Sequence, residues 1–264
     1  VQGSRGVASH PQSSILDEQR RMTPSISALT KPLYWESDNI EIIDHSSVSD
    51  QKIGDKTFKN LKEEIKNLHL HKMVWQRDVQ HIPGMHDHIY FLNIPNNTES
   101  RPIAGLSACN EKEATVVANL TQYLLLCGIP PGSISIITPY KGQSNLIKRN
   151  LRDRRILPKY QKESPQPGKL VTISTVDRYQ GDENDVVILS LVRARPGNKF
   201  VALKNRFIVA TSRARLGFYV IGTTEGVKNV DHWEAFVSTL KSQNQIGDSF
   251  RLCCPRHNVL PANF

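Results

Sequence analysis

The chain has 264 residues, of which 38% are hydrophobic and 22% are charged. This balance excludes the fibrous and intrinsically disordered classes, and no stretch approaches the roughly 18–20 consecutive apolar residues of a membrane span. We expect one main globular domain without a membrane partner, because single cores stop growing near roughly 250–300 residues.

Basic residues outnumber acidic ones, which gives a formal net charge of +9 and an isoelectric point near 9.4. Such a charge favours polyanionic partners, because Lys and Arg that neutralise phosphates release condensed counterions. A basic but otherwise ordinary surface explains the charge equally well. The four cysteines do not form a disulfide framework in a chain of this size, which indicates a reducing, intracellular location, either cytoplasmic or nuclear.

The chain begins with Val1 rather than Met and opens without a secretory signal, so we expect it to be a piece of a longer protein. Residues 1–14 are rich in Gly, Ser, Gln and Pro and are predicted to be a disordered lead-in. The main domain is expected over residues 15–242. Within it, residues 35–88 form an excursion of uncertain fold in which only 61–70 is clearly helix-like. The tail, residues 243–264, has no periodicity.

Hydrophobic periodicity predicts alternating helices and strands from residue 88 onwards. An earlier helical pattern covers 15–34, with Pro24 as a turn-former. Alternation of this kind predicts an α/β fold, with a parallel sheet covered by helices on both faces. The expected strands are 89–94, 133–138, 169–174, 186–192 and 217–221, and the expected helices are 110–127, 142–154, 201–215 and 230–240.

Ligands of parallel α/β sheets bind beyond the carboxyl ends of the strands. This rule selects the segment 138–143, the segment 174–183, and the pair Arg213 and Arg215 before the last buried strand. These three places are the candidate functional regions.

The motifs at these places resemble a known family. Gln180-Gly181-x-Glu183-x-Asp185 with the apolar run after it, and Val209-Ala210-x-Ser212-Arg213-Ala214-Arg215, resemble motifs V and VI of superfamily-1 helicases, in the branch of the nonsense-mediated-decay helicase. Thr138-Pro139-Tyr140 is similar to their motif IV, and Gln19-Arg20-Arg21-Met22-x-Pro24 resembles the element that follows their motif III. Four motifs in the right order make an accidental match very improbable.

The resemblance covers residues 15–240 and implies the second, C-terminal RecA-like domain of a P-loop NTPase fold. In that role Arg21 and Arg213 would be arginine fingers, which stabilise the negative charge that accumulates on a transferring γ-phosphoryl group. The alternative for Arg213 is a simple ion pair with a carboxylate at a helix end. The tail at Cys253-Cys254-Pro255-Arg256-His257 resembles the entry to the zinc region of helicases with X-box-factor-type zinc fingers.

Four residues are implied to bind the nucleotide: Arg20, Gln180, Gly181 and Glu183. Gly181 lets the backbone approach a phosphate oxygen, and the two oxygens of Glu183 can accept both ribose hydroxyls. Arg20 stands where relatives often carry an aromatic residue that stacks on the base, and a guanidinium can stack there too.

A second set, Thr138, Tyr140, Lys141 and Thr175, is expected to contact single-stranded RNA or DNA. Hydroxyl and ammonium groups suit phosphate and sugar contacts that hold a strand without reading its sequence. The alternative is that Thr138 and Thr175 only cap the helices that follow them.

No Gly-x-x-x-x-Gly-Lys-Ser/Thr loop occurs, and no acidic pair follows a strand as a magnesium-holding motif would. ATP with Mg²⁺ would therefore be shared with an N-terminal RecA-like domain of the same protein, and this chain alone is not expected to hydrolyse ATP. The tail offers too few ligands at suitable spacing for tetrahedral zinc, so we expect no metal site.

The favoured interpretation is the C-terminal motor domain of an ATP-dependent RNA or DNA helicase, with 5′ to 3′ polarity by resemblance. The alternative is a non-catalytic basic scaffold derived from a helicase, in RNA-silencing or decay assemblies.

Overall fold

The computed structural model describes residues 17–48, 82, 84–95, 107–127, 129–156, 170–197, 200, 202–254 and 257–262. A six-stranded sheet in the order β5-β4-β6-β7-β3-β8 forms its centre, and every neighbouring pair in this sheet is parallel. The strands are β3 (Ile89–Asn93), β4 (Ile134–Thr138), β5 (Thr172–Thr175), β6 (Asn184–Ser190), β7 (Ala214–Gly222) and β8 (Ile246–Gly247). The α/β fold class predicted from the sequence is confirmed.

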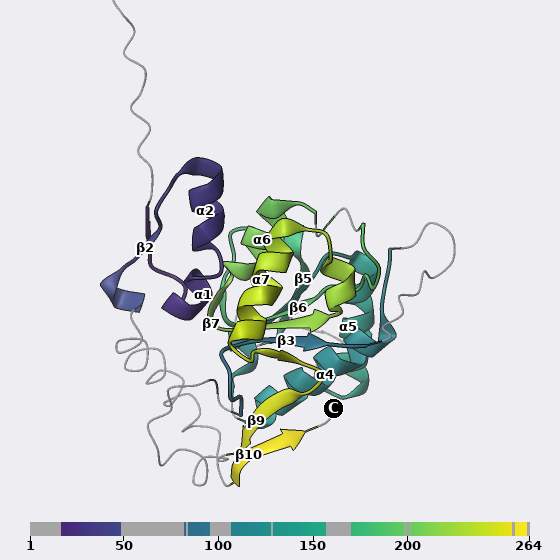
Figure 1. Cartoon of the computed structure of the whole chain (residues 1–264). Coiled ribbons are helices and arrows are strands. Elements are labelled where there is room, and N and C mark those ends of the chain that lie inside the picture. Colours follow the sequence, from purple (N-terminus) through teal and green to yellow (C-terminus); the bar gives the residue numbers. More distant parts are fainter. Residues whose placement is uncertain are drawn as a thin grey trace, which may run out of the picture.

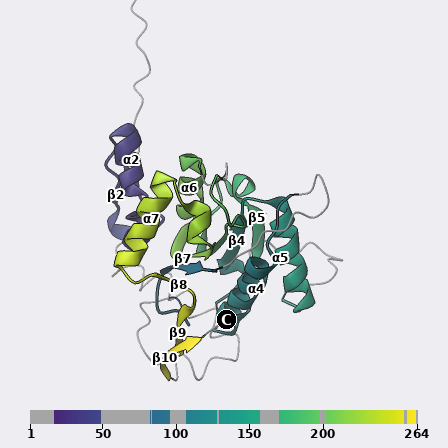
Figure 2. The same ribbon diagram turned by 45° about the vertical axis from the view of Figure 1, so that its right-hand side comes forward.

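Helices cover both faces of this sheet (Figures 1 and 2). One face packs against α4 (Glu111–Leu126) and α5 (Lys141–Asp153). The other packs against α1 (Pro24–Ser27), α6 (Lys204–Thr211) and α7 (Asp231–Ser242). Alternate residues of each central strand belong to the two cores, which explains why β4 and β6 are buried at every position. The other helical elements are α2 (Lys31–Asp38), η1 (Ser46–Val48), η3 (Pro131–Ser133), η4 (Val176–Tyr179) and η5 (Thr224–Val227).

The helix α4 begins as its sequence predicts. The side chain of Asn110 accepts a hydrogen bond from the backbone N–H of Glu113 at 3.1 Å, and the acidic residues Glu111 and Glu113 lie in the first turn. Both features stabilise the amino end of a helix.

The helix expected over 201–215 is shorter than predicted, because α6 ends at Thr211 and β7 begins at Ala214. Asn184 N–H donates to the carbonyl of Arg213 at 3.0 Å, and Asn184 is paired with Ala214 across the two strands. Sheet pairing therefore replaces helix at this point. As a result Arg213 lies in a turn and Arg215 lies in a strand.

The amino-terminal segment also differs from the single helical pattern expected over 15–34. It forms β1 (Glu18–Gln19), the short helix α1, and α2, and β1 pairs in parallel with β2 (Ile43–Asp44). The cause is local: the side chain of Gln19 accepts hydrogen bonds from the backbone N–H groups of Arg21 and Met22, which favours a turn over a helix. The helix-like stretch 61–70 lies outside the described residues.

The segment after α7 remains attached to the sheet. β8 pairs with β3, and β9 (Phe250–Cys254) pairs antiparallel with β10 (His257–Ala262). Arg251 forms a two-pronged ion pair with Asp87, whose side chain is 8% exposed. Packing therefore continues past residue 242, where the main domain was expected to end. Within the described residues no helix combines the length and the apolar character needed to cross a bilayer.

Candidate functional site

The candidate residues lie at opposite edges of the parallel sheet. Glu183 and Arg213 directly precede β6 and β7, at the amino edge, whereas Tyr140 and Lys141 follow β4 at the carboxyl edge. The carboxyl-edge rule used on the sequence is therefore wrong for the amino-edge group. The chain reaches that edge because η4 leads back along the sheet, with Tyr179 Oη donating to Ser135 Oγ near the start of β4 at 2.8 Å. The seven residues of β6 separate the two edges by about 20 Å.

Gln19 shapes the loop that carries Arg21. Its amide Nε2 donates to the carbonyl of Met22 at 2.9 Å and to Asp44 Oδ1 at 2.7 Å, while its Oε1 accepts from two backbone N–H groups. The N–H of Thr23 then donates to the carbonyl of Arg215 at 2.9 Å, which ties the loop to β7. These bonds fix where the side chain of Arg21 leaves the backbone.

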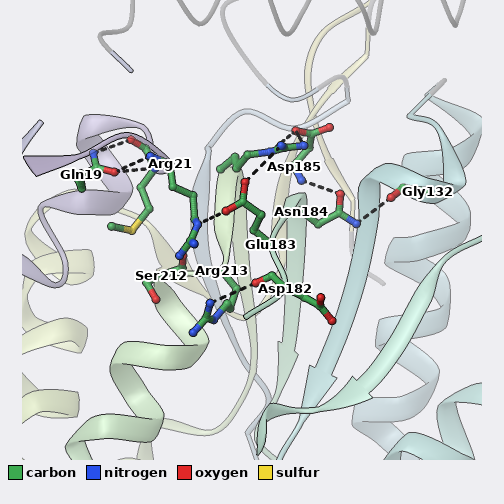
Figure 3. A network of polar contacts seen from close by, with 11 residues as sticks. Gln19, Arg21, Gly132, Asp182, Glu183, Asn184, Asp185, Ser212 and Arg213 are labelled. Carbon is green, nitrogen blue, oxygen red and sulfur yellow. Dashed lines mark hydrogen bonds and ion pairs between the residues drawn. The ribbon is translucent and has the colours of Figure 1, made fainter. Parts of the chain in front are cut away.

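An ion-pair chain runs across the amino edge (Figure 3). Arg21 Nε donates to Glu183 Oε2, and Arg215 Nη1 lies 3.6 Å from Glu183 Oε1. Arg215 also pairs with Asp185 Oδ1, at 2.9 Å from Nε and 2.8 Å from Nη2. Glu183 therefore lies between two guanidinium groups that come from different parts of the chain.

Arg213 lies beside Arg21, but its side chain donates hydrogen bonds to backbone carbonyls and not to carboxylates. Its Nε donates to the carbonyl of Val209 at 3.2 Å and its Nη1 to the carbonyl of Asp182 at 3.3 Å. Within the described residues no carboxylate lies within ion-pairing distance of it. The simple ion pair considered as the alternative for Arg213 is therefore not formed with those residues. Burial, and next the positive charge of Arg21, lower the pKa of Arg213 below its ordinary value.

Two further observations at this edge fit a phosphate. Arg21 Nη1 donates to the carbonyl of Ser212 at 3.2 Å, which brings the guanidinium of Arg21 to the turn that carries Arg213. Gly181 has a φ of +97°, and a Cβ added there would meet nothing within 4 Å. Neighbouring cations beside open backbone suit a polyanion, so these residues fit the triphosphate of a nucleotide.

The other two candidates for nucleotide binding are Arg20 and Gln180. The guanidinium of Arg20 is paired with Glu18 at 2.8 Å and is 66% exposed. Gln180 is exposed at the end of η4. Among the residues that the structure describes, no contact links Arg20 or Gln180 to Arg213.

At the carboxyl edge, Thr138 and Thr175 are register partners at the ends of β4 and β5. Thr175 is half-buried and makes no capping hydrogen bond to η4, and the position that caps α5 is Tyr140, not Thr138. Neither threonine therefore makes the helix-capping hydrogen bond that was considered as its alternative role. The side chain of Thr138 is fully buried, and its Oγ1 has no hydrogen-bond partner within the described residues. Its hydroxyl is thus not on the surface where a nucleic-acid strand would lie.

Tyr140 and Lys141 open the helix α5, and Lys141 is exposed. Above the ring of Tyr140 lies the guanidinium of Arg193, 5.4 Å from the ring centroid, with its Nε 3.3 Å from Tyr140 Oη. The candidates taken from the sequence did not include Arg193. It follows the carboxyl end of β6, so the rule that selected residues 138–143 would also have found it.

The described residues that suit a phosphate do not also supply a site for a magnesium ion. Across the part of the chain that the structure describes, no three His, Cys, Asp or Glu side chains gather in a way that could hold a metal ion. The side chains of the tail residues considered for zinc, Cys253, Cys254 and His257, lie outside the described set.

Comparison with known proteins supplies the family. A family model described as "AAA domain" matches residues 4–225. The chain belongs to this AAA domain family. It is 36% identical over 180 residues to the mouse NFX1-type zinc finger-containing protein 1, and 40% identical over 120 residues to the mouse RNA helicase aquarius. It is 31% identical over 164 residues to regulator of nonsense transcripts 1 of Dictyostelium discoideum. The resemblance to superfamily-1 helicases, in the nonsense-mediated-decay branch, is thereby confirmed.

The matches cover 67%, 46% and 61% of this chain but only 9%, 8% and 12% of the three relatives. This AAA domain chain therefore spans about a tenth of their length. A solved structure, the C-terminal domain of a possible DNA helicase from Lactobacillus plantarum WCFS1, aligns over 67% of this chain and 89% of its own with 11% identity and a TM-score of 0.35, which is too low to support a conclusion.

Proposed function

We propose that this chain is the second motor lobe of an ATP-dependent helicase that acts on single-stranded RNA or DNA inside the cell, in the cytoplasm or nucleus. Its amino edge would complete an ATP site whose phosphate-binding loop belongs to an N-terminal RecA-like lobe of the same protein. Its carboxyl edge would hold the nucleic-acid strand. The observation that carries this proposal is that Arg21 contacts the turn that carries Arg213, while Arg213 contacts the carbonyl of Asp182, the residue after Gly181.

The chemistry follows from the charges at this edge. When the γ-phosphoryl group moves to water, negative charge accumulates on its oxygens, and guanidinium groups already aimed at those oxygens stabilise the transition state. Arg213 suits this task because only carbonyl groups accept its hydrogen bonds within the described residues, and no carboxylate there forms an ion pair with it. An anion placed beside it would relieve the unfavourable burial of that charge.

Arg21 would be the second finger, and Glu183 and Gly181 would approach the ribose and a phosphate. Arg20 and Gln180 remain candidates for contact with the base. Bound Mg²⁺ would supply further neutralisation of phosphate charge. The described residues do not gather ligands for it, so we assign no step of the mechanism on this chain to the metal.

The test uses the protein together with its N-terminal lobe. Changing Arg213→Ala should reduce ATP turnover by about 10³-fold or more, the order associated with an arginine finger, while nucleotide affinity changes little. Single-turnover hydrolysis and titration with a fluorescent nucleotide measure the two quantities separately. Unchanged turnover would refute the finger role. Absence of turnover in the unmodified protein, together with intact nucleic-acid binding, would favour the scaffold alternative.

A further inference from the structure

The helix α5 presents a line of basic side chains on its outer side. Its apolar residues are buried in the core that covers one face of the sheet. On the opposite side of the helix lie four basic residues, three exposed and one, Lys148, partly exposed; we call them the basic stripe: Lys141, Lys148, Arg149 and Arg152. Lys141, Lys148 and Arg152 are separated by about two turns and about one turn of helix, so they follow one another along the same side of α5.

The cations of the basic stripe have no acidic partners in the part of the chain that the structure describes. No carboxylate there lies within ion-pairing distance of any of the four. The one acidic residue of α5 is the exposed Asp153. Elsewhere basic side chains are paired, as Lys31 is with Asp44 at 2.7 Å. Like charges four residues apart, such as Lys148 and Arg152, destabilise a helix, so this arrangement favours a polyanionic partner.

The position of the basic stripe favours a nucleic acid as that partner. α5 begins at the carboxyl edge of the sheet, directly after β4, and β5 is the strand at the end of the sheet on this side (Figure 2). Lys141 therefore belongs both to the proposed nucleic-acid edge and to the basic stripe. From Lys141 to Arg152 the helix rises about 16 Å, a length that spans several nucleotides of a strand.

The chemistry of the basic stripe is less suited to an acidic protein. Among the described residues, no exposed large hydrophobic side chain lies on α5. Protein partners are usually held by buried aromatic or apolar anchors, with charged residues at the rim. Phosphates of a nucleic-acid backbone need only cations placed along their path.

We propose that the basic stripe binds the phosphate backbone of the single strand after the strand leaves the carboxyl edge, so that the nucleic-acid site continues along α5. This proposal rests on the proposed function, since it lengthens the track assigned to the carboxyl edge. Cations that follow a backbone bind it without reading its sequence. The basic stripe therefore adds affinity for long strands and none for short strands that end at the carboxyl edge.

The experiment compares fluorescently labelled oligo-uridines of about 5 and about 15 nucleotides, which bind to the 264-residue chain over a series of salt concentrations. The double variant Lys148→Gln/Arg152→Gln removes two charges from the basic stripe and keeps Lys141. For the long strand it should weaken binding about tenfold at low salt. It should also reduce the slope of log affinity against log salt by about 1.4, because each phosphate contact on a single strand contributes about 0.7. For the short strand both quantities should stay unchanged.

The matched control is Lys241→Glu, which lowers the net charge by the same amount on α7, at the opposite face of the sheet. General electrostatics predicts that the control and the double variant weaken binding equally at both strand lengths, and that result would overturn the inference. Labelled polyglutamate tests an acidic protein as the partner. A smaller loss for polyglutamate than for the long strand supports the nucleic acid, whereas an equal loss overturns that assignment.

The outcomes distinguish this inference from the function on which it rests. If the unmodified chain binds neither strand in a salt-dependent way, the proposed nucleic-acid edge itself is refuted. If the short strand binds and Lys141→Ala weakens its binding, while the double variant matches Lys241→Glu with the long strand, only the present inference fails. Circular dichroism verifies that each variant is folded.

Discussion

The guanidinium of Arg21 is ion-paired with the carboxylate of Glu183, which lies 162 positions further along the chain. The second oxygen of that carboxylate faces Arg215. A ribose that bound to Glu183 would therefore have to compete with two guanidinium groups for the same oxygens. The pair also holds Arg21 at the amino edge of the sheet.

Removing the charge of Glu183 should separate affinity from turnover. In the protein with the proposed N-terminal lobe, Glu183→Gln leaves Arg21 and Arg215 less neutralised, so we expect tighter binding of ADP. We expect slower turnover as well, because Arg21 loses the partner that orients it. Nucleotide titration and steady-state hydrolysis measure the two effects. Asp153→Asn, an exposed change at the end of α5, is the control. Weaker ADP binding with unchanged turnover would show that the contact of Glu183 with the ribose outweighs its pairing with Arg21.

Arg213 and Arg215 are two residues apart and should affect stability in opposite ways. Arg215→Ala leaves the carboxylate of Asp185, only 8% exposed, without its guanidinium, which should lower the free energy of unfolding by about 1–3 kcal/mol. Arg213→Ala removes a cation that burial and Arg21 both disfavour, so stability should stay equal or rise. Urea unfolding of the isolated chain measures both variants. Equal losses would contradict this account of Arg213.

Asp44 should make the stability of the folded chain depend on pH in the acid range. Burial alone would raise its pKa, but hydrogen bonds from Lys31, Ser27 and Gln19, together with the charge of Lys31, lower it below the ordinary value of 3.8. A lowered pKa in the folded state adds stability above the unfolded pKa, and this stability is lost as pH falls through the folded pKa. We therefore expect Asp44→Asn to be less stable than the unmodified chain at neutral pH, by about 1 kcal/mol.

The stability difference between Asp44→Asn and the unmodified chain should begin to shrink below about pH 4, where the unfolded carboxyl protonates, and should disappear as pH falls through the lowered pKa of folded Asp44. Thermal unfolding across a pH series measures it. A difference that stays constant down to the lowest pH would show that the charge of Asp44 is not responsible.

Thr138 and Thr175 provide a matched pair at the carboxyl edge. Thr138→Val removes a buried hydroxyl that has no partner within the described residues, so stability should rise by up to about 1 kcal/mol and oligonucleotide binding should not change. Thr175→Val alters a half-buried side chain at the register partner, and should weaken binding with little effect on stability. Reduced binding by Thr138→Val in a folded chain would show that Thr138 reaches the strand.

The central strands and α4 could be predicted because their signals are local. Val186 to Leu189 are apolar at every position, and Asn110 with its acidic neighbours marks a helix start in any context. The end of α6 could not be predicted, because it depends on pairing between Asn184 and Ala214, which are distant in sequence. The amino-terminal turns depend likewise on side-chain bonds made by Gln19.

The site was predicted in part for a similar reason. Motif resemblance selected Arg21 and Arg213, and the fold brings them to one edge. Motifs do not report what each side chain binds in the absence of ligand, so the pairing of Glu183 with Arg21 was not foreseen. The backbone at Val192, with a φ of +73°, has no sequence signal of its own, because valine ordinarily avoids that conformation.

Strand β6 begins directly after Glu183 and ends shortly before Arg193, which lies at the opposite edge of the sheet. It is buried at every position and hydrogen-bonded on both sides, to β4 and to β7. We therefore expect the strand to move as one rigid unit. A tilt imposed at its first residue must swing its last residue through the same angle. The proposed ATP side and the proposed nucleic-acid side therefore need no separate relay between them, because one rigid strand joins the two edges.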